Sequence, residues 1–263
     1  MDNYLEINKT LWNAKMDYHV ASEFYDNQNF LEGASSLNPI ELELLGNVEG
    51  KSILHLQCHF GQDSISLSRL GAKVTGVDLS DQAIKKAEEM TSLTQTDATF
   101  ICCDVYSLPQ FLTQEFDIVF TSYGTIGWLP DMDKWAKIVH QFLKPQGKLI
   151  FVEFHPVVWM YDNDFSKIQY NYFNETPIIE EEQGTYADPD APISNTCITW
   201  NHSISEVLNS LIKNGLTING LNEFDYSPYN CFNQIVQEEP KKYRIKHLAD
   251  KFPMVYSILA TKK

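Results

Sequence analysis

The sequence lacks the long apolar run that a membrane-spanning helix requires. No continuous apolar stretch in its 263 residues approaches about 18 residues, and the first ten residues have neither the basic segment nor the apolar core of a signal peptide. The five cysteines are an odd number and two are adjacent, which does not suit a disulfide framework. We therefore expect a reduced, cytoplasmic protein with no membrane partner.

Positive charge is also scarce. The chain has 20 lysines and arginines against 35 aspartates and glutamates, and a net charge of −15 repels the phosphates of nucleic acids. Apolar residues make up 43% of the chain and aromatic residues 13%, which is enough for the core of one large domain. These values favour a single domain, residues 1–263, and argue against a nucleic acid substrate. We expect a monomer or homodimer.

Residues 51–80 have the pattern of one strand–helix–strand unit. Ser52 to Leu56 is a short apolar run, Gly61 and Gly71 bracket a polar segment, and Lys73 to Val77 is a β-branched run that ends at Asp78. Two parallel strands need a crossover of about a dozen residues, which a helix supplies. The 17 residues from Gly61 to Asp78 are close to the spacing of about 20 between a nucleotide-binding loop and its ribose acid. The unit therefore predicts a nucleotide site at the carboxyl ends of its strands.

The string LHLQCHFGQD, residues 54–63, resembles the first motif of class I S-adenosylmethionine-dependent methyltransferases, in which an acidic residue precedes G-x-G-x-G. His55 stands in the acidic position, and Gly61 is the one motif glycine present. The string resembles a variant found in a bacterial subgroup of these enzymes. Further resemblance runs from near Trp12 to the C-terminus, through TSYGTIGWLPDMDKW, VEFHP, WNHSISE and FDYSPY. It implies methyl transfer from S-adenosylmethionine to a small molecule, with S-adenosylhomocysteine as product.

The resemblance also implies a fold and a division of the chain. The fold is an α/β, doubly wound, Rossmann-like sheet of seven strands, the last one antiparallel. We expect an N-terminal helical lid (residues 1–37), a cofactor-binding core (38–155), an insertion after strand five that covers the substrate (156–202), and a C-terminal helix with strands (203–263).

The cofactor loop departs from the family motif. Gln57 and His59 replace two glycines, which removes positions where the backbone adopts positive φ easily. We expect Gln57, Cys58, His59 and Gly61 to bind the cofactor either with negative φ or through side chains. A zinc site at His55, Cys58 and His59 is an alternative, but a strand-to-loop placement points these side chains apart and no second ligand cluster is present, so we predict no metal.

Two acidic residues are the expected nucleotide anchors. Asp78, followed by Leu79, ends the second strand, where a carboxylate can accept from both ribose hydroxyls. Asp104 follows a predicted strand at 98–102, and in the resembling family the acid in this place accepts from the adenine amino group. The backbone of the next residue, Val105, then serves the ring.

A second loop follows a predicted strand at residues 116–121 and contains two glycines and two large rings. In the resembling enzymes this loop lies beneath the methyl donor, so Thr121 and Tyr123 are candidate cofactor contacts. Tyr123 is also a candidate catalytic residue, and Trp128 a substrate contact. A ring face can stabilise a sulfonium cation, although Trp128 could equally anchor the following helix.

Glu153 and His155 end a predicted strand at residues 147–154. An ionisable pair at a carboxyl edge suits general base catalysis, so His155 is a candidate catalytic base and both residues are candidate substrate contacts. A lone histidine is more often structural, and that reading stays open.

Rings in the flanking segments complete the expected substrate site. The helix that contains Ile7, Leu11 and Ala14 at helical spacing would form the lid. The insertion is expected to be hairpin-like, with Trp159, Tyr161, Tyr172 and Trp200 inward and Glu180 to Glu182 as a solvated face. The candidate substrate contacts in these segments are Trp12, His19, Tyr25, Trp200 and Tyr229.

Two other functions remain open. The lost glycines suit a catalytically silent cofactor- or nucleotide-binding protein. A nicotinamide-dependent oxidoreductase would also place Asp78 on a ribose, but G-x-G-x-x-G is absent.

Overall fold

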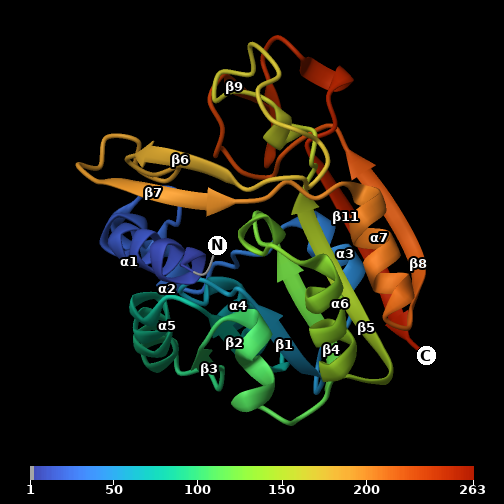
Figure 1. Cartoon of the computed structure of the whole chain (residues 1–263). Coiled ribbons are helices and arrows are strands. Elements are labelled where there is room, and N and C mark those ends of the chain that lie inside the picture. Colours follow the sequence, from blue (N-terminus) through green and yellow to red (C-terminus); the bar gives the residue numbers. More distant parts are fainter. Residues whose placement is uncertain (1–2) are drawn as a thin grey trace.

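The structure is a computed structural model that describes residues 3–263; the first two residues of the expected lid lie outside the described residues. A seven-stranded sheet in the order β3-β2-β1-β4-β5-β11-β8 forms its centre (Figure 1). Neighbouring strands from β3 to β5 are parallel, whereas β11 is antiparallel to β5 and β8, which confirms the predicted sheet. The strands are β1 (Ser52–Leu56), β2 (Lys73–Asp78), β3 (Thr99–Cys102), β4 (Phe116–Ser122), β5 (Leu143–Phe154), β8 (Leu216–Phe224) and β11 (Val255–Lys262).

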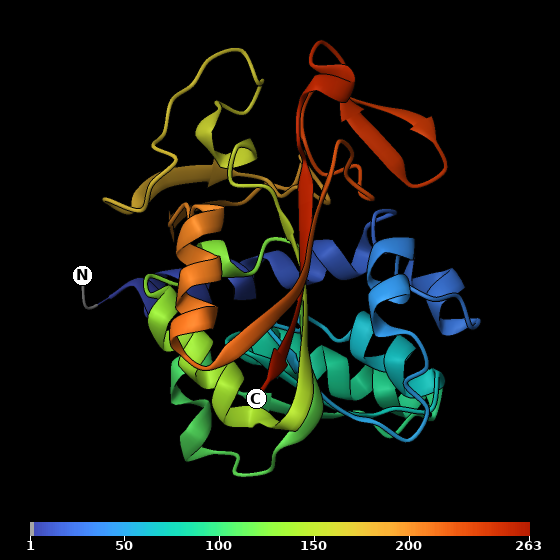
Figure 2. The ribbon, with the colours of Figure 1, turned by 90° about the vertical axis from the view of Figure 1, so that its right-hand side faces the viewer.

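Helices cover both faces of the sheet (Figure 2). One face has α3 (Pro39–Leu45), α4 (Gln62–Arg69) and α5 (Asp81–Thr94), and the other has η1 (Val105–Gln110), α6 (Met132–Phe142) and α7 (Ile204–Lys213). The expected crossover helix is α4, which begins directly after Gly61. Ser80 caps α5 as predicted, because its hydroxyl accepts a hydrogen bond from the amide of Ala83.

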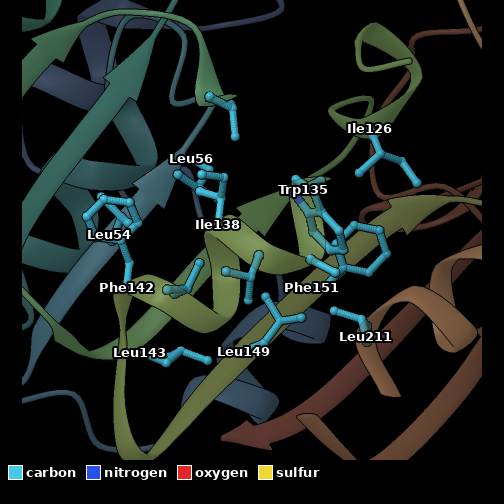
Figure 3. Packing of buried hydrophobic residues seen from close by; sticks show 14 of the residues in the cluster. Leu54, Leu56, Ile126, Trp135, Ile138, Phe142, Leu143, Leu149, Phe151 and Leu211 are labelled. Carbon is cyan, nitrogen blue, oxygen red and sulfur yellow. The ribbon is translucent and has the colours of Figure 1, made fainter. Parts of the chain in front are cut away.

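The largest apolar cluster packs α6 and α7 against the sheet (Figure 3). Trp135 of α6 is fully buried, and its ring meets that of Phe151 of β5 edge to face with 5.5 Å between centroids. Full burial of such a side chain contributes about 1.5–3 kcal/mol. This packing fixes β4 and β5, whose carboxyl ends carry several candidate site residues.

β5 starts earlier than predicted. The sequence places Pro145 and Gly147 between helix and strand, but α6 ends at Phe142 and Leu143 already pairs with Phe116 of β4. A register shift follows this pair, and Gln146 has a φ of +62°. The turn-forming residues therefore lie inside an irregular strand.

The N-terminal segment forms α1 (Tyr4–Ala21) and the short α2 (Asn27–Leu31). In Figure 1, α1 lies between the β6–β7 hairpin and α5, across the end of the sheet. Leu11 of the expected stripe is buried, but Ile7 and Ala14 are only half-buried. The buried face of α1 instead consists of Asn8, Leu11, Lys15, Met16 and His19.

The insertion contains the expected hairpin. β6 (Ile178–Gln183) pairs antiparallel with β7 (Ser194–Thr199), and Asn8 of α1 exchanges two hydrogen bonds with the backbone of Ile198. Trp200 is buried, but Trp159 is 38% exposed and does not point inward as predicted. It follows the start of η3 (Val158–Met160).

A second hairpin, β9 (Ile235–Glu239) and β10 (Lys242–Ile245), was not predicted. Figure 2 shows it and the β6–β7 hairpin on opposite sides above the same end of the sheet. The remaining single turns are η2 (Ile126–Trp128) and η4 (Ala249–Lys251). Within the described part of the chain, no helix is both long and apolar enough to cross a membrane.

Candidate active site

Loops from the carboxyl ends of β1, β2 and β4 touch one another at one edge of the sheet. The side chain of Gln57, after β1, donates to the carbonyl oxygen of Thr125, after β4, at 2.7 Å. The amide of His59 donates to Asp78 Oδ2, at the end of β2, at 2.8 Å. The ligand edge predicted from the sequence is therefore a connected set of loops.

The loop after β1 has a left-handed backbone at every other residue. Gln57, His59 and Gly61 have φ values of +56°, +52° and +82°. Of the two expected alternatives, negative φ at Gln57 and His59 is excluded, since the chain keeps positive φ at both positions where the family motif has glycine. Each such non-glycine residue costs about 1–2 kcal/mol, and strain of this kind concentrates at ligand sites. Binding of the cofactor through the side chains of Gln57 and His59 stays a prediction.

Gly61 is required by packing as well as by its φ. A Cβ atom at this position would lie 2.7 Å from the ring of Phe100 on β3. The glycine therefore lets the start of α4 approach β3 closely.

Asp78 connects this loop to the end of β2. Its Oδ2 accepts from His59 N, and its Oδ1 accepts from the amide of Ser80 at 2.9 Å. Burial raises the pKa of Asp78 to about 6, although the backbone donors oppose that shift. Each oxygen of a carboxylate has two acceptor positions, so Asp78 can still accept from two hydroxyls. Leu79 lies between Asp78 and Ser80.

Asp104 caps the single turn η1. Its Oδ1 accepts from the amides of Tyr106 and Ser107 at 2.9 and 3.2 Å. Among residues 3–263, no group donates a hydrogen bond to its Oδ2, which leaves one oxygen for a ligand. Val105 starts the turn directly beside it.

Glu153 organises the loop after β4. This fully buried carboxylate accepts from the amides of Gly124, Thr125 and Ile126, from the hydroxyl of Thr125, and from its neighbour Phe154. Burial raises its pKa, and these donors oppose the shift. With its oxygens engaged this way, Glu153 is a loop-positioning residue rather than the substrate contact that the sequence suggested.

The side chains of three predicted cofactor residues contact other protein groups. The Sγ atom of Cys58 is buried beside Gly76 of β2 and lies 3.6 Å from the carbonyl oxygen of His59. The hydroxyl of Thr121 donates to that of Thr125 at 3.1 Å, inside the loop. Gln57 bridges the two loops, and its Oε1 is buried without a hydrogen-bond partner among the described residues.

A ring cluster from α1 and from the turn between α1 and α2 covers the loop after β1. His19 Nδ1 and His59 Nε2 lie 3.1 Å apart, and Tyr25 stacks on the ring of His59. Burial is the main cause that lowers the pKa of His19 to about 2 and that of His59 to about 3, and nearby Lys15 lowers both further. Both imidazoles are therefore neutral near pH 7, and Trp12 meets the rings of His59 and Trp128 edge to face.

Two further aromatic candidates are anchored by the protein. Trp128 donates from Nε1 to the carbonyl of Gly124 at 2.8 Å. Trp200 donates its amide to the carbonyl of Gly127 at 2.8 Å and packs edge to face on Tyr4. Trp200 thus connects the insertion to the loop after β4.

Tyr123, the first residue of the loop after β4, belongs to a polar cluster with Glu41. Its φ is +48°, its amide donates to the carbonyl of Val152 at 2.7 Å, and its hydroxyl donates to Glu41 Oε2 at 2.7 Å. Its ring packs edge to face against Tyr229, and the hydroxyl of Tyr229 accepts from Asn38 at 2.8 Å. Tyr123 and Tyr229, far apart in sequence, therefore contact each other as candidate site residues.

His155 does not suit the predicted role of general base. Its Nε2 lies 2.9 Å from Glu223 Oε1 of β8, and its Nδ1 accepts from the amide of Val157 at 3.2 Å. Its ring packs against Tyr256 of β11. Both nitrogens are engaged within the protein, so His155 anchors β5 to the outer strands, and we withdraw it as base and substrate contact.

The sequence did not predict five further residues of the site: Lys15, Glu41, Asp63, Glu182 and Tyr186. Asp63 accepts from the hydroxyls of Ser36 and Ser122, and the ring of Tyr186 packs against that of His19. Lys15 could have been found from the sequence, because it lies four residues from both Leu11 and His19 and therefore on the same helix face. Glu41 was recognised only as the capping-box residue of α3, a role that the structure confirms. Glu182 had been placed in a solvated acidic run, but it pairs with Lys15.

The five cysteines are all free. His55, once weighed as a zinc ligand, instead lies with Nδ1 2.8 Å from the hydroxyl of Ser64. Among residues 3–263, no group of three or more histidine, cysteine or acidic side chains is arranged to hold a metal ion.

Residues 53–147, from within β1 to the start of β5, match the family model described as a methyltransferase domain. This part of the chain is similar to that domain family. It includes Gln57, His59, Asp78, Asp104 and Tyr123.

Curated relatives match about half of the chain. A ubiquinone biosynthesis O-methyltransferase from Idiomarina loihiensis is 29% identical over 136 residues, which are 50% of this chain and 56% of that protein. The chain thus spans about half the length of the curated relatives it matches.

Two solved structures share the fold over most of the chain. A proposed S-adenosylmethionine dependent methyltransferase from Listeria monocytogenes matches with a TM-score of 0.63 and 21% identity, over 85% of this chain and 95% of that one. One from Mesorhizobium loti matches with a TM-score of 0.58 and 22% identity, over 88% of this chain and all of that one. The fold is therefore that of Rossmann-like methyltransferases.

Proposed function

We propose that this protein is an enzyme that transfers the methyl group of S-adenosylmethionine to a small molecule. The observation that carries the proposal is the hydrogen bond from the amide of His59 to Asp78. It joins a left-handed loop in the frame of the family motif to an acid at the end of the next strand, which is the arrangement of a nucleotide site. The match of residues 53–147 to a methyltransferase domain supports the same cofactor.

The residues at the edge of the sheet fit this cofactor. Asp78 keeps acceptor positions for ribose hydroxyls, with Leu79 beside it, and Asp104 Oδ2 can accept from the adenine amino group, with the amide of Val105 beside the ring. The loop Gln57 to Gly61 would face the methionine part. Gln57 Oε1 and His19 Nε2 are buried and have no hydrogen-bond partner within residues 3–263. They could therefore pair with the polar groups of the methionine part. The cofactor supplies an activated methyl group on a sulfonium.

The acceptor would bind between the lid and the loop after β4. Trp12, Tyr25, Trp128 and Tyr229 present rings there, and Tyr123 presents a phenol at the carboxyl end of β4. Ring-lined sites with a few polar groups suit small aromatic molecules. The name of the Idiomarina relative, an O-methyltransferase, supports a hydroxyl oxygen as the acceptor atom. Orientation of that atom is the main task of the protein.

The remaining segments would serve access and location. Residues 3–37 would act as a lid that moves for the cofactor to reach His59, because Trp12, His19 and Tyr25 pack against that residue. The insertion 156–202 would cover the acceptor. The five free cysteines support a reducing, cytoplasmic location. The net charge of −15 argues against a nucleic acid substrate. The protein would act as a monomer or homodimer.

The test is formation of S-adenosylhomocysteine from S-adenosylmethionine across a panel of phenols and catechols, followed by mass spectrometry. We expect the wild type to methylate at least one acceptor, and Asp78→Asn to lower kcat/KM about tenfold or more because one hydrogen bond to a ribose is worth about 1–2 kcal/mol. Binding of adenosylhomocysteine without any methylation would support the silent binding protein. Displacement of adenosylhomocysteine by NAD would support the oxidoreductase.

A further inference from the structure

Glu41 is a fully buried carboxyl group without a cation. It lies in the first turn of α3, where its Oε1 accepts from the amide of Asn38 and its Oε2 accepts from the hydroxyl of Tyr123 at 2.7 Å. No lysine, arginine or histidine among residues 3–263 forms an ion pair with it. Buried acids are ordinarily paired with a cation or a metal, so a capping role alone does not account for its depth.

The groups around Glu41 make its charge less favourable. Asp63 of α4 approaches from one side, where it accepts from the hydroxyls of Ser36 and Ser122. Tyr123 and Tyr229 approach from the loops after β4 and β8. Burial and the charge of Asp63 raise the pKa of Glu41 to about 7, while the hydrogen bonds from Tyr123 and Asn38 oppose the shift. The group can therefore exchange a proton near neutral pH.

Tyr123 is held in a geometry that directs its phenol to Glu41. The residue has a φ of +48°, which is uncommon for a bulky side chain and costs about 1–3 kcal/mol. Its amide is fixed to Val152 and its hydroxyl to Glu41. Because the phenol donates its proton to Glu41, its oxygen lone pairs remain available to accept a proton from another molecule.

Tyr123 also borders the cofactor loop and the lid. Its neighbour Ser122 is hydrogen-bonded to Asp63, two residues after Gly61, at 3.3 Å. On the other side, Phe24 of the lid stacks on Tyr229, which packs on Tyr123. The phenol is thus placed between the proposed cofactor and acceptor sites.

We propose that Glu41 is the terminal proton acceptor of a Tyr123–Glu41 relay that deprotonates a hydroxyl acceptor during methyl transfer. This inference rests on the proposed function. The acceptor O–H proton passes to Tyr123 Oη while the phenol proton passes to Glu41 Oε2. The electron pair left on the acceptor oxygen bonds the methyl carbon as the C–S pair returns to sulfur. Tyr123 ends unchanged, Glu41 is protonated and later releases its proton to water, and Glu41 acts as a positioning residue through Tyr123.

The first experiment needs no acceptor. Difference infrared spectra of the wild type against Glu41→Gln follow the protonated carboxyl band with pH, and Glu43→Gln, an exposed acid on the same helix, is the matched control. We expect a midpoint near neutrality in the wild type and in Glu43→Gln. It should rise in Tyr123→Phe, because the phenol hydrogen bond that favours the carboxylate is lost. A carboxyl that stays ionised down to pH 5, or a midpoint unmoved by Tyr123→Phe, overturns the relay.

The second experiment separates proton transfer from binding. Catechol is the probe acceptor, and calorimetry with S-adenosylhomocysteine is run on every variant. We expect Glu41→Gln and Tyr123→Phe to keep cofactor affinity within about threefold, to lose at least tenfold in kcat, and to lose the acidic limb of the pH–rate profile. An acidic limb that survives in Glu41→Gln overturns the proposal. If the wild type binds no cofactor, the proposed function fails instead. If it binds but does not methylate catechol, the infrared result decides.

Discussion

Lys15 of α1 and Glu182 of β6 form a two-pronged ion pair, with Nζ 2.9 Å from Oε1 and 2.8 Å from Oε2. The Lys15 side chain is 2% exposed and that of Glu182 is 30% exposed. The ammonium also lies 4.9 Å from the ring centre of Trp12. The pair therefore joins the lid to the insertion at the site.

Removal of the carboxylate should destabilise the protein. Glu182→Gln leaves a buried ammonium without its counter-charge, so we expect a loss of about 2 kcal/mol in the free energy of unfolding. The control is Lys9→Met, which breaks the exposed pair of Lys9 with Asp81 and should cost less than about 1 kcal/mol. Urea unfolding measures both, and equal losses would contradict the assigned difference in burial.

Strain in the loop after β1 should be separable from its function. Gln95 has a φ of +54° at the end of α5 and is exposed, so Gln95→Gly should stabilise the protein by about 1 kcal/mol. Gln57 has nearly the same φ, but its side chain bridges to Thr125. Gln57→Gly should therefore show no gain in thermal unfolding and should weaken adenosylhomocysteine binding. An equal gain in both variants would mean that the bridge is unimportant.

The stability of the protein should depend on pH through Glu41. Its pKa is raised from 4.5 to about 7 in the folded state, so the folded state binds this proton more tightly than the unfolded chain. Between pH 4.5 and 7 the folded protein therefore holds more protons, and stability falls as pH rises, by about 3 kcal/mol from this group. Urea midpoints against pH for wild type and Glu41→Gln give the difference curve. A flat difference contradicts the assignment.

Glu153 should control the loop after β4. Glu153→Gln replaces an acceptor that faces backbone amides with a group that has an NH₂, so at least one amide loses its partner. We expect a loss of about 2–3 kcal/mol in stability and weaker adenosylhomocysteine binding. His155→Gln, two residues further along the chain, should leave that binding within about twofold. Calorimetry on both variants decides, and a stronger effect at His155 would reverse the roles assigned here.

Local patterns predicted one parallel strand–helix–strand unit, from the apolar runs, Gly61 and Asp78. The resemblance to the methyltransferase family supplied the seven-stranded sheet with its antiparallel last strand. The β9–β10 hairpin was not predicted, because its strands, IVQEE and KYRI, are short and mostly polar and give only a weak strand pattern around Pro240 and Lys241. The positions of Asp78 and Asp104 at the carboxyl edge of the sheet were predictable, because each follows from the end of a strand that the sequence pattern indicates.

Side-chain direction was not predictable in the same way. The sequence places Glu153 and His155 at the end of β5, but their partners, the amides after β4 and Glu223 of β8, come from distant segments. Similarly, the positive φ of Gln57 and His59 runs against their intrinsic preference. Tertiary contacts, such as the His59 hydrogen bond to Asp78, override that preference.

We propose that the loop after β1, Asp78 and Asp104 bind S-adenosylmethionine. The most direct measurement is calorimetric titration of S-adenosylhomocysteine into the wild type, Asp78→Ala and Asp104→Ala, with the exposed Asp97→Ala as control. We predict binding in the micromolar range for wild type and Asp97→Ala, weakened about tenfold or more in the other two variants. A folded wild type that binds no adenosylhomocysteine, or binding unchanged by both substitutions, would contradict this account.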